Sequence, residues 1–262
     1  MSRIADTFAN LKRANRRGFI PFITAGDPDL HTTRELIVEL ARAGATLIEL
    51  GIPFSDPMAD GPVIQRASER ALRQDFGISD VLQIVSGARK ETDVPIILFS
   101  YFNPLLQFGI EKLAHKAKSA GVDGILVTDL VPEEANEFAS ILRANDLDMI
   151  FLIAPTSTDQ RLQMVAERAS GFIYAVSRAG ITGARKEMSA EAEKLVCRMR
   201  TFSDLPIAVG FGISTPEHVA DVWRYADAAV VGSAIVSEIE EAESPAAAVK
   251  RVAVFSRQLL AS

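Results

Sequence analysis

The sequence predicts an α/β protein folded as a closed (β/α)8 TIM barrel. Eight short apolar runs recur along the 262 residues, and their starts are mostly about 22–34 residues apart, the length of one strand–helix unit. The runs are continuously apolar, which is typical of parallel strands covered by helices. An open doubly wound sheet would more often have five or six strands. A short apolar run can also be a buried helical segment, so the strand number rests on this regular spacing. The expected strands are Phe19–Thr24, Thr46–Leu50, Pro95–Ser100, Gly124–Thr128, Met149–Ile153, Phe172–Val176, Pro206–Gly210 and Ala228–Gly232.

Amphipathic segments between the runs predict the helices. An extra N-terminal helix over Ile4–Ala14 is expected to close the bottom of the barrel. A last helix is expected over Pro245–Leu260. A capping box predicts a helix that starts at Thr32, and prolines at a first helical position predict helices at Pro132 and Pro216. The wide second interval and the long C-terminal segment leave room for additional helices near strands 2 and 8. Because no Pro/Gly-rich linker appears, residues 1–262 are expected to form a single catalytic domain.

Composition excludes several classes of function. The net charge of −6 argues against binding to nucleic acid or to an anionic membrane surface. Cys197 is the only cysteine, and the three histidines are far apart, so no metal site is expected. The N-terminal residues show no signal-peptide pattern and no stretch is long and apolar enough for a membrane span, so a cytoplasmic location is expected.

Glu49 is the first candidate catalytic residue. Active sites of such barrels lie at the carboxyl ends of the strands, and Glu49 lies near the end of the apolar run TLIEL. Burial there would raise the pKa of the carboxyl toward the range useful for proton transfer. Two other interpretations remain open, a carboxylate that reaches solvent and one that pairs with an arginine of a neighbouring strand.

The loop that follows, GIPFSDPMADGPVIQRA, offers two further carboxylates, Asp56 and Asp60. Its three prolines would hold both in fixed places on the catalytic side. Either aspartate could instead make an Asx turn before the proline or glycine that follows it. We favour the turn for Asp56, whereas Asp60 stays open on position alone.

The turns after the last three strands are rich in glycine and predict a phosphate site. They contain Gly183, Gly212 and the pair Gly232–Ser233. Barrels commonly bind phosphate with the backbone N–H groups of these loops and of a helix start. Tight turns alone would explain any one of them, but three consecutive turns favour phosphate.

Residue types and motifs that the sequence lacks disfavour several reaction mechanisms. None of the eight lysines lies in a predicted strand, which disfavours a Schiff-base aldolase, and the scattered histidines disfavour a metal-dependent one. Nucleotide-binding motifs are also missing. Acid–base chemistry by carboxylates on a phosphorylated substrate remains. Phe22, Ile64, Phe99 and Phe211 near the same rim indicate an aromatic moiety, or ordinary barrel core.

These residues resemble the tryptophan synthase α subunit family. The resemblance extends from about Phe19 to Val236 through the blocks IELGIPFSDPMADGPVIQRA, PIILFSYFNPLLQFG, DGILVTDLVPEE, IAPTSTDQRL, GFIYAVSRAGITGAR, VGFGIST and VVGSAIV. Departures are mild. Met58 stands where leucine is commoner, and the turn near Asp129–Pro132 is less proline-rich.

The resemblance implies retro-aldol cleavage of indole-3-glycerol phosphate to indole and glyceraldehyde 3-phosphate, with Glu49 and Asp60 as the acid–base pair. It places Tyr174 and Thr182 beside Asp60. The implied phosphate contacts are Gly183, Gly212, Gly232 and Ser233, and the implied indole contacts are Phe22, Ile64 and Phe211.

The resemblance also implies a partner. No cofactor is expected in this chain, and pyridoxal phosphate (PLP) is expected in a β subunit that receives the indole for tryptophan biosynthesis within an α2β2 heterotetramer. The loop after the second strand and the segment Tyr101–Phe108 are candidate docking surfaces, or simply loops. Two alternatives are a stand-alone indole-3-glycerol-phosphate lyase and a binding subunit that mainly activates the β partner.

Overall fold

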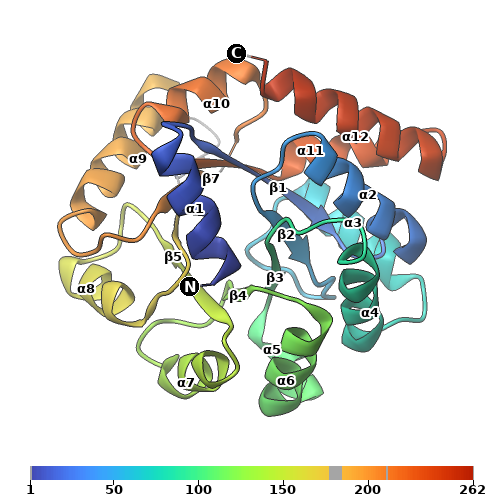
Figure 1. The fold of residues 1–262 in the computed structure, drawn as a ribbon, viewed down its shortest axis with the longest axis horizontal. Coiled ribbons are helices and arrows are strands. Elements are labelled where there is room, and N and C mark those ends of the chain that lie inside the picture. The colour runs from blue at the N-terminus through green and yellow to red at the C-terminus, as the bar shows by residue number, and fades with distance from the viewer. Residues whose placement is uncertain (1, 177–184, 211, 262) are drawn as a thin grey trace.

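The computed structural model describes residues 2–176, 185–210 and 212–261. Eight parallel strands pair in chain order, and β8 pairs with β1, so the sheet closes into a barrel (Figure 1). The predicted (β/α)8 fold is therefore confirmed. The strands are β1 (Gly18–Thr24), β2 (Ile48–Gly51), β3 (Ile96–Ser100), β4 (Gly124–Val127), β5 (Asp148–Ile153), β6 (Ile173–Val176), β7 (Ile207–Gly210) and β8 (Ala228–Val231).

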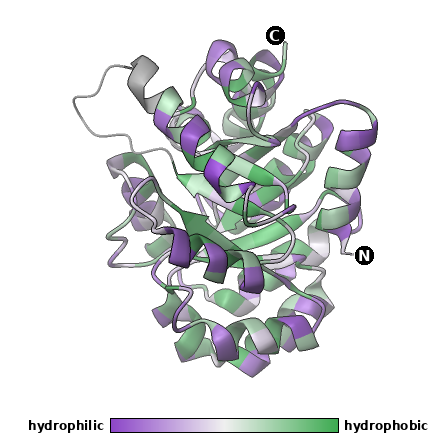
Figure 2. Ribbon diagram, turned by 90° about the vertical axis from the view of Figure 1, so that its left-hand side faces the viewer, coloured by the Kyte–Doolittle hydropathy of each residue, from purple (hydrophilic) through white to green (hydrophobic). Residues whose placement is uncertain are grey.

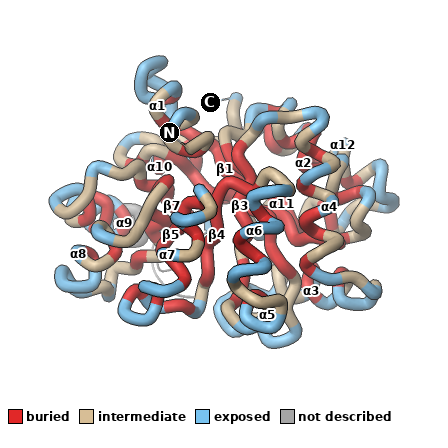
Figure 3. Tube along the Cα trace, turned by 60° about the horizontal axis from the view of Figure 1, so that its bottom comes forward, coloured by how far each residue is buried: buried red, intermediate tan, exposed pale blue. Residues whose placement is uncertain are grey.

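Helices surround the barrel, with their exposed faces outward and the buried strands in the middle (Figure 3). They are α1 (Arg3–Arg13), α2 (Leu30–Arg42), α3 (Pro62–Leu72), α4 (Ile78–Ala88), α5 (Phe102–Phe108), α6 (Ile110–Ala120), α7 (Asn136–Ala144), α8 (Asp159–Arg168), α9 (Arg185–Met199), α10 (Pro216–Trp223), α11 (Ser233–Glu240) and α12 (Pro245–Leu259). The extra helices predicted near β2 and β8 are present as α3 and α4 and as α11 and α12. The short helix α5 after β3 was not predicted.

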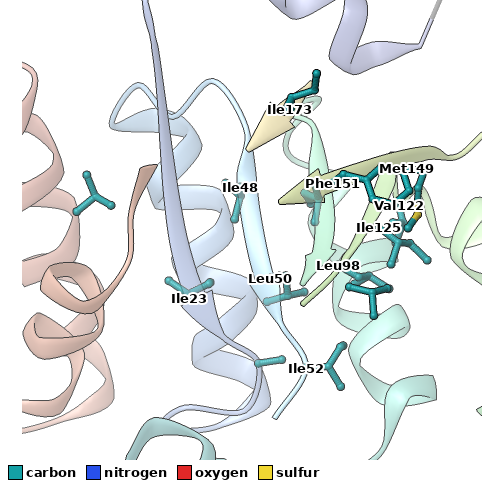
Figure 4. Packing of buried hydrophobic residues seen from close by; sticks show 14 of the residues in the cluster. Ile23, Ile48, Leu50, Ile52, Leu98, Val122, Ile125, Met149, Phe151 and Ile173 are labelled. Atoms are coloured by element: carbon teal, nitrogen blue, oxygen red, sulfur yellow. The ribbon is translucent and has the colours of Figure 1, made fainter. Parts of the chain in front are cut away.

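Two apolar layers hold the barrel together. Strand residues that face outward, such as Ile23 and Leu50, pack against the helices (Figure 4). Figure 2 shows the same division, with hydrophobic strands inside and hydrophilic residues concentrated on the helices. A second cluster fills the interior of the barrel, where the ring centroids of Phe8 from α1 and of Phe172 lie 5.8 Å apart. The N-terminal helix therefore closes the bottom of the barrel, as predicted.

Two predicted helix starts are wrong. The helix expected at Thr32 begins at Leu30, because the Asp29 side chain caps it and accepts a 2.7 Å hydrogen bond from the Thr32 backbone N–H. The helix expected at Pro132 begins at Asn136, because the preceding residues form turns in which the Glu134 N–H donates to the Val131 carbonyl. By contrast, Thr215 caps the helix that starts at Pro216, as expected.

The second strand is also shorter at its start than predicted. Thr46 lies outside β2, and its hydroxyl instead bonds the backbone of Phe19, accepting from the N–H at 2.9 Å and donating to the carbonyl at 2.8 Å. These bonds tie the chain before β2 to the start of β1. They leave Glu49 inside the strand, directly beside Phe22 in the parallel register.

Candidate active site

One cavity lies at the carboxyl ends of the strands, with a volume of about 510 Å³. That size suits a small-molecule site. Eight predicted site residues line this cavity: Phe22, Glu49, Asp60, Ile64, Tyr174, Gly212, Gly232 and Ser233. The other three, Thr182, Gly183 and Phe211, lie outside the described residues. Residues from the first, second, sixth, seventh and eighth strand–helix units thus meet in one place.

Glu49 lies in β2 with only 1% of its surface exposed. No arginine pairs with its carboxyl group in the described part of the chain, and its Oε1 atom has no hydrogen-bond partner there. Burial without compensation disfavours the charged form, so the pKa of Glu49 is raised well above its ordinary value. The two alternative interpretations, an exposed carboxylate and an arginine-paired one, are wrong for this residue.

Tyr174 lies across the barrel on β6 and is buried. Burial raises the pKa of its hydroxyl, and the negative charge of Glu49 raises it further. The charge that acts on the Tyr174 hydroxyl is thus that of Glu49, and Asp60, beside which the resemblance places Tyr174, lines the same cavity. Gly210 on β7 leaves room for this hydroxyl, since a Cβ atom there would lie 2.0 Å from the Tyr174 Oη atom.

We expect Gly210→Ala to lower kcat/KM at least about tenfold, because the added methyl group must push the Tyr174 hydroxyl out of place. Gly77→Ala is the matched control. A Cβ atom at Gly77 meets nothing within 4 Å, and the residue lies outside the cavity. Steady-state kinetics of both variants check the expectation, and wild-type turnover in Gly210→Ala would contradict it.

Asp60 lies in the loop after β2, immediately before Gly61, the N-cap of α3. Burial raises the pKa of its carboxyl to about 6, although a hydrogen bond from the Tyr101 hydroxyl lowers it. The same hydroxyl accepts a 2.9 Å bond from the Ala59 backbone N–H. Tyr101 thus holds both the carboxyl group and its loop, a role that we did not predict. The available signal was its position just beyond the carboxyl end of β3.

Asp56 does not line this cavity. It is exposed, its carboxylate accepts a 2.6 Å bond from the Ser55 hydroxyl, and its backbone carbonyl accepts from the Met58 N–H. Asp56 therefore lies in a local turn, as favoured, but the acceptor is its backbone carbonyl and not the side-chain oxygen that an Asx turn uses.

Apolar side chains make up the wall near the two carboxyl groups. The rings of Phe22 and Phe99 pack edge to face, with 5.3 Å between centroids and an interplanar angle of 78°. Gly51 makes room for the ring of Phe22, because a Cβ atom there would lie 2.5 Å from the ring. The lining residues that we did not predict are Ala59, Gly61, Thr128, Leu152, Val176, Ile213, Ser214, Val230, Ala234 and Ser237. Most are small or apolar residues at strand and helix ends, with nothing in the sequence to distinguish them.

The part of the cavity at the start of α11 is suited to attract an anion. Helix α11 begins there at Ser233, and no side chain caps it, so its first backbone N–H groups have no capping acceptor. Gly212, which also lines the cavity, has φ of +69°, which favours glycine. Among the described residues that line the cavity there is no lysine, arginine or histidine. Any anion attracted by these residues would be held by N–H groups, hydroxyls and the helix dipole.

Within the described ranges, no cluster of His, Cys, Asp and Glu is placed to hold a metal ion. No helix in those ranges is long and apolar enough to cross a membrane. The site therefore combines the buried carboxyl group of Glu49 and the half-buried one of Asp60, both with raised pKa values, with an apolar wall and a helix start.

Fold and site together define a (β/α)8 barrel with a carboxylate pair suited to acid–base chemistry. Comparison with known proteins specifies the family. The sequence profile of the tryptophan synthase alpha chain family matches residues 8–262. The tryptophan synthase alpha chain of Solibacter usitatus is 48% identical over 99% of this chain and 97% of its own length. The chain belongs to the tryptophan synthase alpha chain family.

Other relatives agree. The alpha chain of Geobacter sp. strain M21 is 51% identical over 92% of this chain and 90% of its own length. The crystal structure of tryptophan synthase subunit alpha from Legionella pneumophila superposes with a TM-score of 0.91 at 38% identity, covering 99% of this chain and 97% of that one. A chain of tryptophan synthase from M. tuberculosis, in an aminoacrylate-bound form, has a TM-score of 0.89 at 33% identity, covering 100% and 99%.

Proposed function

We propose that this barrel cleaves indole-3-glycerol phosphate to indole and glyceraldehyde 3-phosphate, with Glu49 and Asp60 as the acid–base pair. The observation that supports this most strongly is that two carboxyl groups with raised pKa values line one largely apolar cavity, whose lining also includes an uncapped helix start. The apolar wall suits an indole ring, and the helix start suits a phosphate group. The family to which the chain belongs supports the same reaction.

The first step protonates the indole ring. Glu49 is neutral at the start because its pKa is raised, and it delivers its proton to C3 of the indole. The ring becomes a positively charged indolenine. Asp60, ionised above its pKa of about 6, accepts a hydrogen bond from the ring N–H and stabilises the new charge.

The second step breaks the carbon–carbon bond. The Glu49 carboxylate left by the first step removes the proton of the glycerol hydroxyl next to that bond. The hydroxyl carbon becomes the aldehyde of glyceraldehyde 3-phosphate, and the bonding electron pair returns to the ring as indole. Glu49 ends protonated as it began, so the cycle consumes no further reagent.

The decisive experiment measures indole release from indole-3-glycerol phosphate by this chain alone and with a β subunit. We expect low release alone and much greater release together. Substantial release alone would favour a stand-alone lyase. No release in either case, with a β subunit that is nonetheless activated, would favour a mainly activating binding subunit.

The pH dependence of kcat/KM is expected to be bell-shaped. The acidic limb falls as pH drops through about 6, because Asp60 becomes protonated and no longer stabilises the ring charge. The basic limb falls as pH rises through the elevated pKa of Glu49, because the acid that protonates C3 is lost. Initial rates across neutrality check both limbs. A rate that stayed constant well below pH 6 would contradict the role of Asp60.

We infer that the β subunit docks on an apolar rim beside the cavity mouth, formed by Met58, Leu72, Leu106 and Val131. All four are large apolar side chains that water reaches, and Met58 is 92% exposed. Met58, Leu106 and Val131 follow the neighbouring strands β2, β3 and β4, so they belong to the same face as the cavity. The rings of Phe54 and Tyr101, 5.2 Å apart, connect the first two of these loops. Exposed apolar patches of this kind mark interaction sites, and a partner here could receive indole directly.

Placing a charge on this rim should weaken the assembly. We expect Leu106→Asp to reduce the stimulation of indole release by a β subunit at least about tenfold, since it would bury an unpaired carboxylate in the interface. Release by the isolated chain should stay unchanged because Leu106 does not line the cavity. Val254→Asp, at an exposed apolar residue of α12, is the control. Equal stimulation of the Leu106 variant and wild type would place the interface elsewhere.

In such an assembly PLP would be held by the β subunit, and we propose an α2β2 arrangement within which indole passes to it. The cytoplasmic location and the single catalytic domain over residues 1–262 stay predictions. Cell fractionation checks the first of these.

A further inference from the structure

A chain of ion pairs joins three segments behind the active site. Asp27, in the loop after β1, is completely buried. Both of its carboxylate oxygens accept hydrogen bonds from Arg70 of α3, from Nε and Nη2, each at 2.8 Å. This fork-to-fork geometry is the most strongly directional ion pair that side chains form.

The chain continues from α3 to α11. The remaining Nη1 of Arg70 donates to Glu240 Oε1 at 2.7 Å. Arg66, one turn earlier on α3, donates to both oxygens of Glu240 through Nε and Nη2, each at 2.7 Å. Glu240 is the last residue of α11 and receives both arginines. These arginines hold its pKa down to about 2, so it is ionised throughout the neutral range.

The other ends of these two helices form the active site. Helix α3 begins at Pro62, directly after Asp60 and Gly61, and α11 begins at Ser233. Asp60 and Ser233 both line the cavity. The two helices thus run from the proton-transfer end and the anion end of the cavity toward one shared set of ion pairs.

Apolar packing also joins the two helices. Between them lies a buried cluster of Phe22, Ala67 and Val236, against which the partly buried Val63, Ile64 and Phe99 pack. At the cavity end, a Cβ atom on Gly232 would lie 3.8 Å from the Ile64 Cδ1 atom, an ordinary van der Waals contact. Apolar packing is non-directional and tolerates small shifts and tilts, whereas the bidentate Arg–Glu hydrogen bonds have a fixed geometry. Because helices this short move as rigid rods, an anchor at one end sets the separation at the other.

We propose that Arg66, Arg70 and Glu240 are positioning residues that set the distance between the Asp60 end and the Ser233 end of the cavity. The proposal rests on the proposed function, because only a substrate that bears an indole ring and a phosphate occupies both ends at once. The affinity for a ligand that spans the cavity depends on this distance, whereas the affinity for a ligand that occupies one end alone does not.

The test replaces Glu240 by glutamine and measures two ligands by calorimetry. One is an uncleavable analogue in which a propyl chain joins indole to phosphate, and the other is glycerol 3-phosphate. We expect Glu240→Gln to lower the affinity for the spanning analogue about tenfold and the affinity for glycerol 3-phosphate less than about twofold. We also expect it to lower kcat about tenfold or more. A purely structural loss would weaken both ligands alike.

Glu241→Gln is the matched control. Glu241 is the next residue along the chain, but its carboxylate pairs with Arg251 of α12, 2.9 Å away, and does not contact α3. We expect wild-type affinities and turnover from it. Arg66→Gln is a second test variant, since Arg66 is about half exposed and its loss strands no buried charge. Like Glu240→Gln, it should weaken binding of the spanning analogue more than binding of glycerol 3-phosphate, but by a smaller factor.

The outcomes separate the two proposals. If wild type fails to cleave indole-3-glycerol phosphate with a β subunit, the proposed function is wrong whatever the variants do. If wild type cleaves it, equal weakening of both ligands, or an equal effect of Glu241→Gln, overturns the positioning role. A selective loss for the spanning ligand in Glu240→Gln and, by a smaller factor, in Arg66→Gln, with none in Glu241→Gln, supports it.

Discussion

Glu49→Gln is expected to lose at least about 10³-fold in kcat while the barrel stays folded. The amide has nearly the size of the carboxyl group but can neither deliver a proton to C3 of the indole nor remove one from the glycerol hydroxyl. A single general acid–base group contributes about 10²–10⁴-fold, and Glu49 serves in both directions. Single-turnover measurements of indole formation at saturating substrate check the loss. Turnover within a few-fold of wild type would exclude Glu49 as the proton donor.

Thermal unfolding provides the control for this variant. The pKa of Glu49 is raised in the folded barrel, so wild type loses stability as pH rises from the unfolded-state pKa toward the folded-state pKa. Glutamine does not titrate and lacks this loss. We expect the midpoint temperature of the variant, relative to wild type, to rise as the pH is raised through that window. A falling difference would mean that the carboxylate is stabilised in the folded state, contrary to its burial without a partner.

The second large effect is expected for Asp60→Asn. This substitution keeps the shape of the side chain but removes the negative charge that stabilises the protonated ring, and the loss of one such electrostatic group costs about 10²–10³-fold. The variant should also lose the acidic limb of the pH profile, because no group with a pKa of about 6 remains at that position. Comparison of kcat/KM profiles for wild type and variant checks both parts. A retained acidic limb would assign it to another group.

Tyr101→Phe is the companion to this substitution. It removes the hydroxyl whose hydrogen bond lowers the pKa of Asp60, so the acidic limb should move to higher pH. The carboxylate itself remains, and turnover above that limb should fall far less than in Asp60→Asn. A limb that moved to lower pH would show that the hydroxyl does not stabilise the ionised form.

The sequence was informative about the fold because each strand is a local apolar run of its own. All eight strands form within one or two residues of the predicted bounds, since burial on both faces leaves little freedom in their composition. The helix starts were predicted less well. Asp29 and Thr32 are both good caps, and only the backbone conformation decided between them.

The candidate site was predictable where a residue conflicts with its surroundings. Glu49 is a carboxylate within an apolar strand, and Asp60 lies in a stiff loop on the catalytic side. Tyr101 gives no such signal, because its role depends on contact with a loop from a different strand–helix unit. The ion pair between Arg70 and Glu240 joins residues 170 positions apart and involves types that are common on any helix surface. Neither local pattern nor composition identifies partners at such separations.

The set of charges around the cavity has a thermodynamic consequence. The described lining residues include two carboxyl groups and no basic side chain. An anion bound at the start of α11 therefore adds negative charge that no basic lining residue offsets, and the Glu49 carboxyl becomes still harder to ionise. Ligand binding and protonation of Glu49 are then coupled, so a bound phosphate ester would keep on Glu49 the proton that this residue donates in the first step. The phosphate group of the substrate, although remote from the carbon–carbon bond that breaks, would thus help to keep Glu49 in the acid form that starts the cleavage.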